Sequence, residues 1–216
     1  MSCNVLAIGA HPDDIEFGCF GTLKKHIDAG DNVTLLVMTH SSVKDAFTQA
    51  VTRNAQVSVE EAERAAEVLG AELILGPFRD TKVPFDAESV GFVEKIVKSR
   101  NIDTVYTHWS GDTHQDHINT LSATMAATRL VPNVLCYEQV PLPRITTIYP
   151  TANYYVDITD TIQTKLDGCN AHKSQVEKFN QNGFDIIDGI ETLAKYRGNQ
   201  AGVKYAEAFD ILKMVR

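Results

Sequence analysis

Apolar runs alternate with stretches of helical periodicity along the first two-thirds of the chain. Residues 5–8 and 33–38 are apolar at consecutive positions, which indicates strands that are covered on both faces. Shorter strands are predicted at 73–75, 103–107 and 134–137, where β-branched and aromatic residues are frequent. These five segments are the predicted core of one sheet.

Between the strands, apolar residues recur every three or four positions. The spacing of Phe17, Phe20, Leu23 and Ile27 predicts a helix that ends at Gly30. Three further helices have the same periodicity, and they are expected from Ser58 to Gly70, around residues 90–97, and after His117 through Leu121 and Met125 to Leu130. The alternation of strands and helices predicts a mostly parallel sheet in a three-layer α/β/α sandwich.

The remaining segments are less regular. Ser58-Val-Glu-Glu61 matches a capping box and is expected to begin the second helix, which leaves residues 40–57 as a long loop. Tyr154–Ile158 is predicted to be a strand, and a long helix from about Asp160 and a further helical region follow it. Since no repeat or linker interrupts these patterns, residues 1–216 are predicted to form a single domain.

Composition places the chain among soluble globular proteins, with 44% hydrophobic and 22% charged residues. Its net charge of −8 argues against a nucleic-acid partner, because such partners require a basic surface. The four cysteines form no C-x-x-C pair and are expected to be reduced thiols. No apolar run reaches the ~18 residues of a membrane span, and no signal peptide is recognisable, so a cytoplasmic location without a membrane span is expected.

Two polar motifs follow predicted strands directly. Gly9-Ala-His-Pro-Asp-Asp-Ile-Glu16 comes after the first strand, and Asp112-Thr-His-Gln-Asp-His117 comes after the fourth. Ligands of open α/β sheets bind beyond the carboxyl ends of the strands, so neighbouring strands would bring the two motifs together. Three protein ligands and one open position form the usual catalytic zinc site.

Simpler interpretations exist for each motif taken alone. Adjacent aspartates often cap a helix, and Asp14 could cap the helix that follows it. A His-x-x-His pair is by itself a weak sign of a metal site, and His26 and His40 are expected to be solvated or structural. The occurrence of both motifs at two strand ends nevertheless favours a metal centre.

The two motifs resemble those of the LmbE-like, or PIG-L-type, zinc N-deacetylases. Members of that family pair an Ala-His-Pro-Asp-Asp-x-Glu segment after the first strand with a later His-x-x-His segment. Here the matching segments are Ala10–Glu16 and His114–His117. Thr39, the helix from Glu61 to Gly70, His172–Gln175 and Ala206–Phe209 also look like features of the family, so the resemblance extends along the chain. It implies a Rossmann-like fold.

The resemblance also implies roles for individual residues. The zinc ligands would be His11, Asp14 and His117. Asp13 would be the general base, and His114 would stabilise the oxyanion or protonate the leaving amine. Asp116 would orient His114 and raise its pKa, provided that the two side chains touch.

The substrate implied by the resemblance is a small-molecule conjugate of an N-acetylated amino sugar, of the N-acetylglucosaminyl type, from which the acetyl group is removed. The alternative is a zinc amidohydrolase that acts on an amide outside sugars. Many relatives have a sugar-binding arginine where this chain has Ser58, so Arg53 is the nearest candidate for that contact, and Trp109 could stack on a sugar ring. The loop at 40–57 could line the pocket or be a surface loop.

Three expectations concern the rest of the molecule. Relatives often form trimers or hexamers, so a homo-oligomer is expected. His172 could pack in the core, support the site or contact substrate. Glu207 is expected to be a buried partner in a salt bridge.

Overall fold

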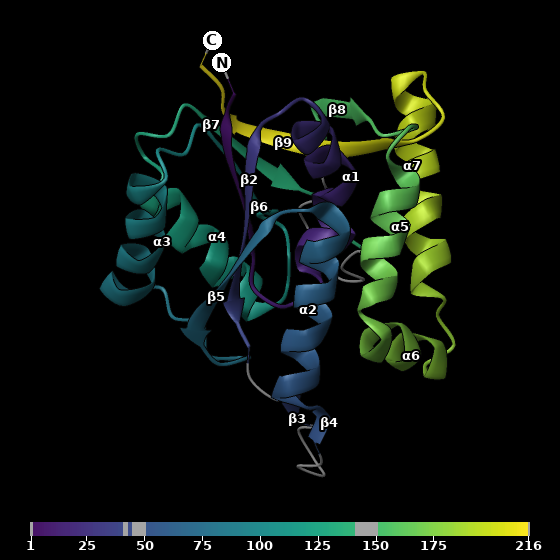
Figure 1. Cartoon of the computed structure of the whole chain (residues 1–216), viewed down its shortest axis with the longest axis horizontal. Helices are drawn as coiled ribbons and strands as arrows, with labels where there is room; N and C mark the ends of the chain where they lie inside the picture. The colour runs from purple at the N-terminus through teal and green to yellow at the C-terminus, as the bar shows by residue number, and fades with distance from the viewer. Residues whose placement is uncertain (1, 41–42, 45–50, 141–150, 216) are drawn as a thin grey trace.

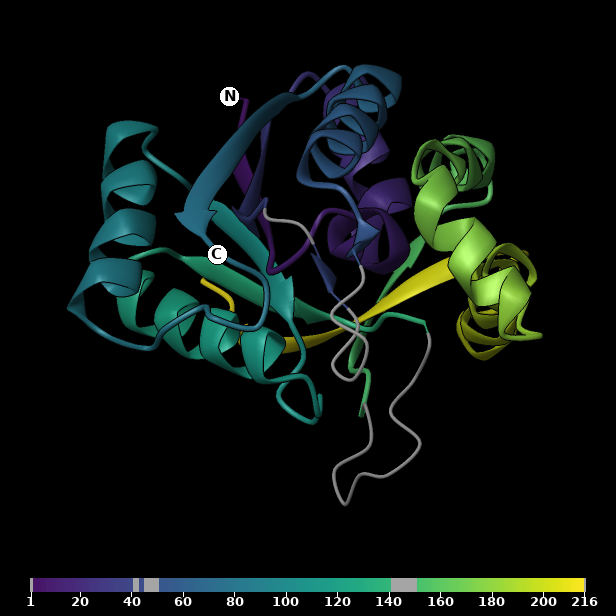
Figure 2. The same ribbon diagram turned by 90° about the horizontal axis from the view of Figure 1, so that it is seen from below.

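The computed structural model describes residues 2–40, 43–44, 51–140 and 151–215, and its centre is a seven-stranded sheet (Figures 1 and 2). The strand order is β5-β2-β1-β6-β7-β9-β8, in which the first five strands are parallel and β9 pairs antiparallel with both of its neighbours. The strands are β1 (Asn4–Gly9), β2 (Asn32–Thr39), β5 (Glu72–Phe78), β6 (Thr104–His108), β7 (Asn133–Tyr137), β8 (Tyr154–Asp157) and β9 (Ala206–Lys213).

Helices cover both faces of the sheet, as the sequence predicted for a three-layer α/β/α sandwich. One face is covered by α3 and α4, and the other by α1, α2 and the C-terminal helices (Figure 1). The helices are α1 (Asp14–Asp28), α2 (Ala55–Leu69), α3 (Ala87–Ser99), α4 (Gln115–Ala127), α5 (Ile162–Ala171), α6 (Lys173–Gln181) and α7 (Ile186–Ala201). A separate hairpin consists of β3 (Val43–Lys44) and β4 (Val51–Arg53).

The central strand β1 shows why consecutive apolar residues form a buried strand. Val5 and Ala7 pack in the cluster that contains α1 and α2 residues, whereas Leu6 and Ile8 pack in the cluster that contains α3 residues. All four side chains are fully buried. Successive side chains of a strand point to opposite faces, so a strand covered on both sides must be apolar at every position.

The structure differs from the expected elements in three places. The second helix begins at Ala55, with Asn54 as its N-cap, because the Asn54 side chain accepts the N–H of Gln56; Ser58 is buried inside the helix. The expected long helix is broken at His172 into α5 and α6. The strand β9 was not predicted. Residues 41–42 and 45–50 of the expected loop lie outside the described part.

A kink in α1 explains a buried ion pair. Cys19 has non-helical φ and ψ angles, so backbone groups around it lose their partners within the helix. The Glu207 carboxylate accepts the N–H groups of Gly21 and Thr22, at 3.0 and 2.7 Å, and Lys165 Nζ donates to the carbonyls of residues 16 and 17. Lys165 Nζ lies 2.6 Å from Glu207 Oε1, which confirms Glu207 as a buried partner in a salt bridge.

Two further expectations can be compared with the structure. All four cysteines are free, and Cys19, Cys136 and Cys169 are buried. Among the described residues, no helix has both the length and the apolar character that a bilayer span requires.

Candidate metal and catalytic centre

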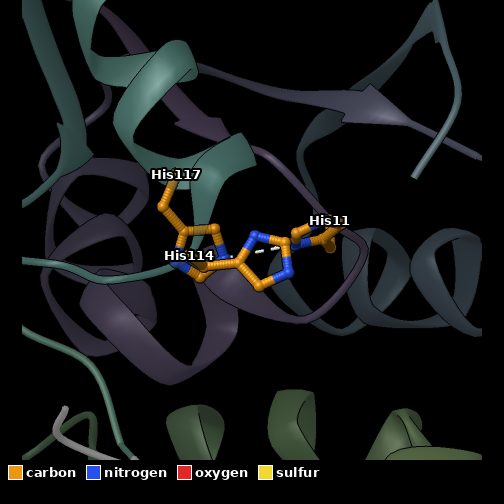
Figure 3. Close-up of side chains that lie close together, drawn as sticks. All are labelled: His11, His114 and His117. Carbon is orange, nitrogen blue, oxygen red and sulfur yellow. Dashed lines mark hydrogen bonds between the residues drawn. The ribbon is translucent and has the colours of Figure 1, made fainter. Parts of the chain in front are cut away.

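The two polar motifs meet at one edge of the sheet. β1 and β6 are neighbouring parallel strands, so the segments that follow them leave the sheet side by side. His11 lies in the turn between β1 and α1, while His114 and His117 lie at the start of α4 (Figure 3). This is the switch point of the sheet, where the strand order reverses: β2 and β5 lie on one side of β1, whereas β6 and β7 lie on the other.

Three donor groups converge at this edge. His11 Nδ1 lies 3.1 Å from His117 Nε2, and the Asp14 carboxylate lies 3.5 Å from His11 Nδ1 and 3.3 Å from His117 Nε2. Tetrahedral zinc with bonds of 2.0–2.1 Å separates its ligand atoms by about 3.3 Å. The separations between these donors therefore fit a small divalent cation.

Two carboxylates fix the tautomers that such an ion requires. His11 Nε2 lies 2.9 Å from Asp116 Oδ2, and His117 Nδ1 lies 2.8 Å from Asp112 Oδ2. A carboxylate can only accept, so each of these ring nitrogens carries the proton. When each ring is neutral, the opposite nitrogen, which faces the other donors, has the lone pair that a metal would bind.

The same carboxylates change the proton affinity of the two rings. Burial alone would lower the pKa of His11, but hydrogen bonds to Asp116 and Asp14 raise the pKa to about 10. Burial likewise opposes protonation of His117, yet the charge of Asp14 and the hydrogen bond to Asp112 raise the pKa of this ring to about 9. The carboxylates around the two rings therefore stabilise positive charge at this place, either as protons on the rings or as a bound cation.

A second group of possible ligands shares His117. It consists of Asp14, His108 and His117, whose donor atoms also lie close together. His108 Nε2, however, accepts the N–H of Ala10 at 2.8 Å, so its lone pair is already used. Burial lowers the pKa of His108 to about 4, which agrees with a neutral ring in this acceptor role. His108 is therefore a weaker candidate ligand, and the set of His11, Asp14 and His117 stays the predicted one; the donor atoms of His114 also lie close to those of His11 and His117.

His108 and Gln139 support this set, and the sequence analysis missed both. The His108 ring stacks on His117 at a centroid distance of 4.1 Å, and Gln139 Nε2 donates to Asp14 Oδ1 at 3.1 Å. His108 is the last residue of β6, and Gln139 lies two residues beyond β7. Both residues could have been predicted from their position at the carboxyl end of a central strand, but this criterion was applied only to the two motifs.

Asp13 has an unusual backbone conformation. Its φ of 128° lies in a region that residues other than glycine rarely occupy, at a cost of about 1–3 kcal/mol. As the N-cap of α1 it makes no side-chain capping bond, so its carboxylate is free for another role. Burial raises the pKa of Asp13 to about 6, against the opposing charge of Arg53. A carboxylate with this pKa can exchange a proton near neutral pH.

His114 caps α4 through its ring. Its Nδ1 accepts the N–H of Asp116 at 3.2 Å, so the neutral ring carries its proton on Nε2. The ring centroids of His114 and His11 are 4.7 Å apart, and those of His114 and His117 are also 4.7 Å apart (Figure 3). His114 therefore brings one N–H donor to the edge of the cluster.

The expected pairing of Asp116 with His114 is wrong. The Asp116 carboxylate bonds to His11 and accepts the N–H groups of Thr81 and Val83, at 2.5 and 3.1 Å. Burial and the charges of the neighbouring histidines lower the pKa of His114, whereas the sequence analysis expected it to be raised. Asp116 therefore orients His11 and fastens the loop after β5 to the site.

The two residues that were expected to contact substrate are both buried. Trp109 is 6% exposed and packs with Leu121 and Cys136, so its ring faces the core. Arg53 is 5% exposed, and its guanidinium donates to the Pro12 carbonyl and to Glu61. In the segment 40–57, which could line the pocket, His40 Nδ1 bonds to a backbone carbonyl, and residues 41–42 and 45–50 lie outside the described residues.

Comparisons with known proteins agree with this geometry. The chain is 27% identical to the diacetylchitobiose deacetylase of Thermococcus kodakarensis, over 94% of this chain and 80% of that protein. It is 35% identical to the uncharacterized deacetylase YaiS of Escherichia coli, over 62% of this chain and 72% of that protein. These likenesses support the prediction of an enzyme that acts on N-acetyl amide bonds.

The fold is shared more widely. The crystal structure of GalB, the 4-carboxy-2-hydroxymuconate hydratase of Pseudomonas putida KT2440, matches with a TM-score of 0.84 at 17% identity, over 99% of this chain and 98% of that one. Since this fold also occurs in a hydratase, the residues of the site must identify the reaction. The family model described as PIG-L, GlcNAc-PI de-N-acetylase, matches residues 6–128, which is more than half of the chain. The chain therefore belongs to the PIG-L family, as its two motifs predicted.

Proposed function

We propose that this protein is a zinc-dependent N-deacetylase that removes the acetyl group from an N-acetylated amino sugar, such as an N-acetylglucosaminyl conjugate. The observation that carries the proposal is the convergence of His11, Asp14 and His117 donors at 3.1–3.5 Å next to Asp13, whose carboxylate makes no capping bond to α1. The sugar substrate is supported by the family and by the diacetylchitobiose deacetylase relative.

In this proposal His11 Nδ1, His117 Nε2 and the Asp14 carboxylate hold the ion. Zinc bound there would lower the pKa of a water molecule to roughly 7 and polarise the acetyl carbonyl. Asp116 and Asp112 keep the two imidazoles in the tautomers that leave the ligating nitrogens unprotonated. Gln139 and His108 limit the movement of Asp14 and His117.

Asp13 and His114 carry out the proton transfer and the charge stabilisation. Asp13 accepts a proton from the water as its oxygen attacks the acetyl carbon. The Nε2–H of His114 donates to the oxygen that becomes negative. Protonated Asp13 then delivers its proton to the amide nitrogen as the C–N bond breaks, which releases acetate and a free amine. The raised pKa of Asp13, about 6, suits both transfers near neutral pH.

The test uses the zinc-loaded full chain with N,N′-diacetylchitobiose, N-acetylglucosamine and, for the non-sugar alternative, N-acetylated amino acids. Free amine and acetate should appear in equal amounts with the sugars, and a chelator should stop the reaction until zinc is restored. Faster release from the amino acids would favour the amidohydrolase alternative. Absence of amine from every substrate would refute the proposed function.

We also propose that the chain forms a homo-oligomer, as its relatives often do. Light scattering of the purified protein at several concentrations tests this directly. A mass equal to that of one 23.8 kDa chain at all concentrations would rule it out.

A further inference from the structure

A buried group of charged side chains adjoins Asp13 and lies outside the proposed metal ligands. Its centre is Arg53, the last residue of β4, whose side chain is 4% exposed. The Arg53 NH1 group donates to the carbonyl of Pro12 at 3.0 Å and lies 3.8 Å from Asp13 Oδ2. Arg53 therefore holds the backbone directly before Asp13 and provides a positive charge beside its carboxylate, without a close hydrogen bond to it.

Two other segments hold the guanidinium in place. The Arg53 NH2 group lies 3.0 Å from Glu61 Oε2 on α2 and 3.4 Å from His172 Nδ1, between α5 and α6. Glu61 also accepts the backbone N–H and the hydroxyl of Ser174, at 2.7 and 2.6 Å. The α2 helix lies between the sheet and the α5–α6 pair, so these contacts connect four parts of the chain (Figure 1).

The contact with Arg53 also fixes the orientation of His172. A guanidinium can only donate, so His172 Nδ1 must accept, and the neutral ring carries its proton on Nε2. This atom lies 3.4 Å from Glu16 Oε2, and neither atom has a closer hydrogen-bond partner among the described residues. His172 is fully buried at the break between the two helices. His172 therefore contacts Arg53 from the junction of α5 and α6.

The geometry points to a positioning function for this group. The Pro12 carbonyl belongs to the peptide plane whose rotation relative to the Asp13 α-carbon defines the φ angle of Asp13. That angle is 128°, which the chain does not adopt without support. We propose that Arg53, held by Glu61 and His172, is a positioning residue that keeps Asp13 in this conformation for proton transfer.

This inference rests on the proposed function and changes the interpretation of Arg53. An arginine that binds substrate directs its free N–H groups into the pocket. Here NH1 and NH2 contact protein groups, and Nε is buried without a partner among the described residues. A substitution at Arg53 should therefore affect the rate of the chemical step more than the binding of the sugar.

The experiment compares Arg53→Lys with Arg64→Lys in the zinc-loaded full chain, with N,N′-diacetylchitobiose as substrate. Arg64 is exposed on α2 and serves as the matched control. Lysine keeps the charge but loses the planar fork, so kcat should fall about a hundredfold. KM should stay within about twofold, because the lost contact is not with substrate. Zinc affinity and the circular dichroism spectrum should match those of the wild type.

His172 provides a second test that does not depend on the folding of the Arg53 variant. His172→Phe removes the acceptor and should lower kcat, whereas His172→Gln retains an acceptor and a donor and should recover part of the loss. A rise in KM at unchanged kcat in Arg53→Lys would show substrate binding and overturn the proposal. An unchanged kcat in both Arg53→Lys and His172→Phe would also overturn it.

Failure of the proposed function would be recognised separately, because wild-type protein would then release no amine. Crystal structures of the wild type and Arg53→Lys test the positioning function without activity. The φ angle of Asp13 should be positive in the wild type and should move to the ordinary negative region in the variant. If Asp13 kept a φ near 128° without the arginine, Arg53 would not be what holds it.

Discussion

His11 Nε2 lies 2.9 Å from the carboxylate of Asp116, which accepts a hydrogen bond from the Nε2–H group and so leaves the lone pair of the neutral ring on Nδ1, where it can bind a metal. Replacement of this carboxylate by an amide in Asp116→Asn should weaken zinc binding about 10- to 100-fold, the usual effect of losing such a partner. Competition with a chromophoric chelator measures this affinity. Asp28→Asn, at an exposed position on α1, is the control and should bind zinc as the wild type does.

The opposite outcome has a clear meaning. If Asp116→Asn bound zinc normally but shifted the pH profile of the reaction, Asp116 would act on His114, as the sequence had suggested. Its bonds to His11 and to the loop after β5 would then be structural details without a catalytic consequence.

Asp13 and Asp14 are adjacent, but the structure gives them different tasks. Asp13→Asn should retain zinc and lose about 10²- to 10⁴-fold in kcat, because the amide cannot accept the proton of water. Asparagine tolerates positive φ angles better than most residues, so the turn should survive. Asp14→Asn should instead lose zinc affinity, since its carboxylate is one of the three converging donors. Metal content and kcat of both variants are measured on the same preparations.

An Asp13→Asn protein with normal kcat would require another general base. Equal loss of zinc in both variants would indicate that both carboxylates bind the ion.

The sequence predicted the parallel part of the sheet because both faces of those strands are covered. In β1 the side chains from Val5 to Ile8 are all buried, so the apolar run was unambiguous. The strand β9, which pairs with β7 and β8, was missed because the charged residues Glu207 and Asp210 interrupt its apolar pattern. Glu207 is tolerated there because it satisfies the N–H groups freed by the kink in α1, which no local pattern reveals.

In the candidate site, too, local patterns predicted some residues, whereas other contacts depend on the tertiary structure. The motifs identified His11, Asp14 and His117 because the strand ends bring them together. The partners of Asp116 could not be predicted in this way. Its carboxylate accepts N–H groups of the loop after β5, which are more than 30 residues away along the chain. Arg53 was considered a substrate contact as the arginine nearest to Ser58, and Trp109 because it lies close to the second motif, but the exposure of a side chain depends on the packed fold.

Zinc should stabilise the protein more strongly as the pH rises. In the metal-free protein, the pKa values of His11 and His117 are raised from 6.5 to about 10 and about 9. Their protonation stabilises the fold fully below pH 6.5, and this contribution is lost as the pH rises through 9 and 10. Zinc competes with these protons, so its binding should release protons. Thermal unfolding at fixed free zinc should show a shift in Tm that grows from pH 6.5 to pH 9.

A zinc-induced shift in Tm that stayed constant or decreased over this range would contradict the assignment of the two imidazoles as ligands. The His11→Ala variant is the matched control. It should show a smaller shift at every pH, with a weaker dependence on pH.

The buried ion pair of Lys165 on α5 and Glu207 on β9 should be the main charged contact at the kink of α1, because both side chains also bond to α1 backbone groups. Both side chains are buried, so Lys165→Met would leave a carboxylate without its charged partner and should lower the free energy of unfolding by about 3–5 kcal/mol. Lys195→Met removes an exposed pair with Glu191 on α7 and should change stability little. Urea unfolding of the three proteins measures the difference. Equal stability of both variants would show that Glu207 keeps its two backbone N–H bonds without the lysine, because those bonds alone would then suffice to hold the kink.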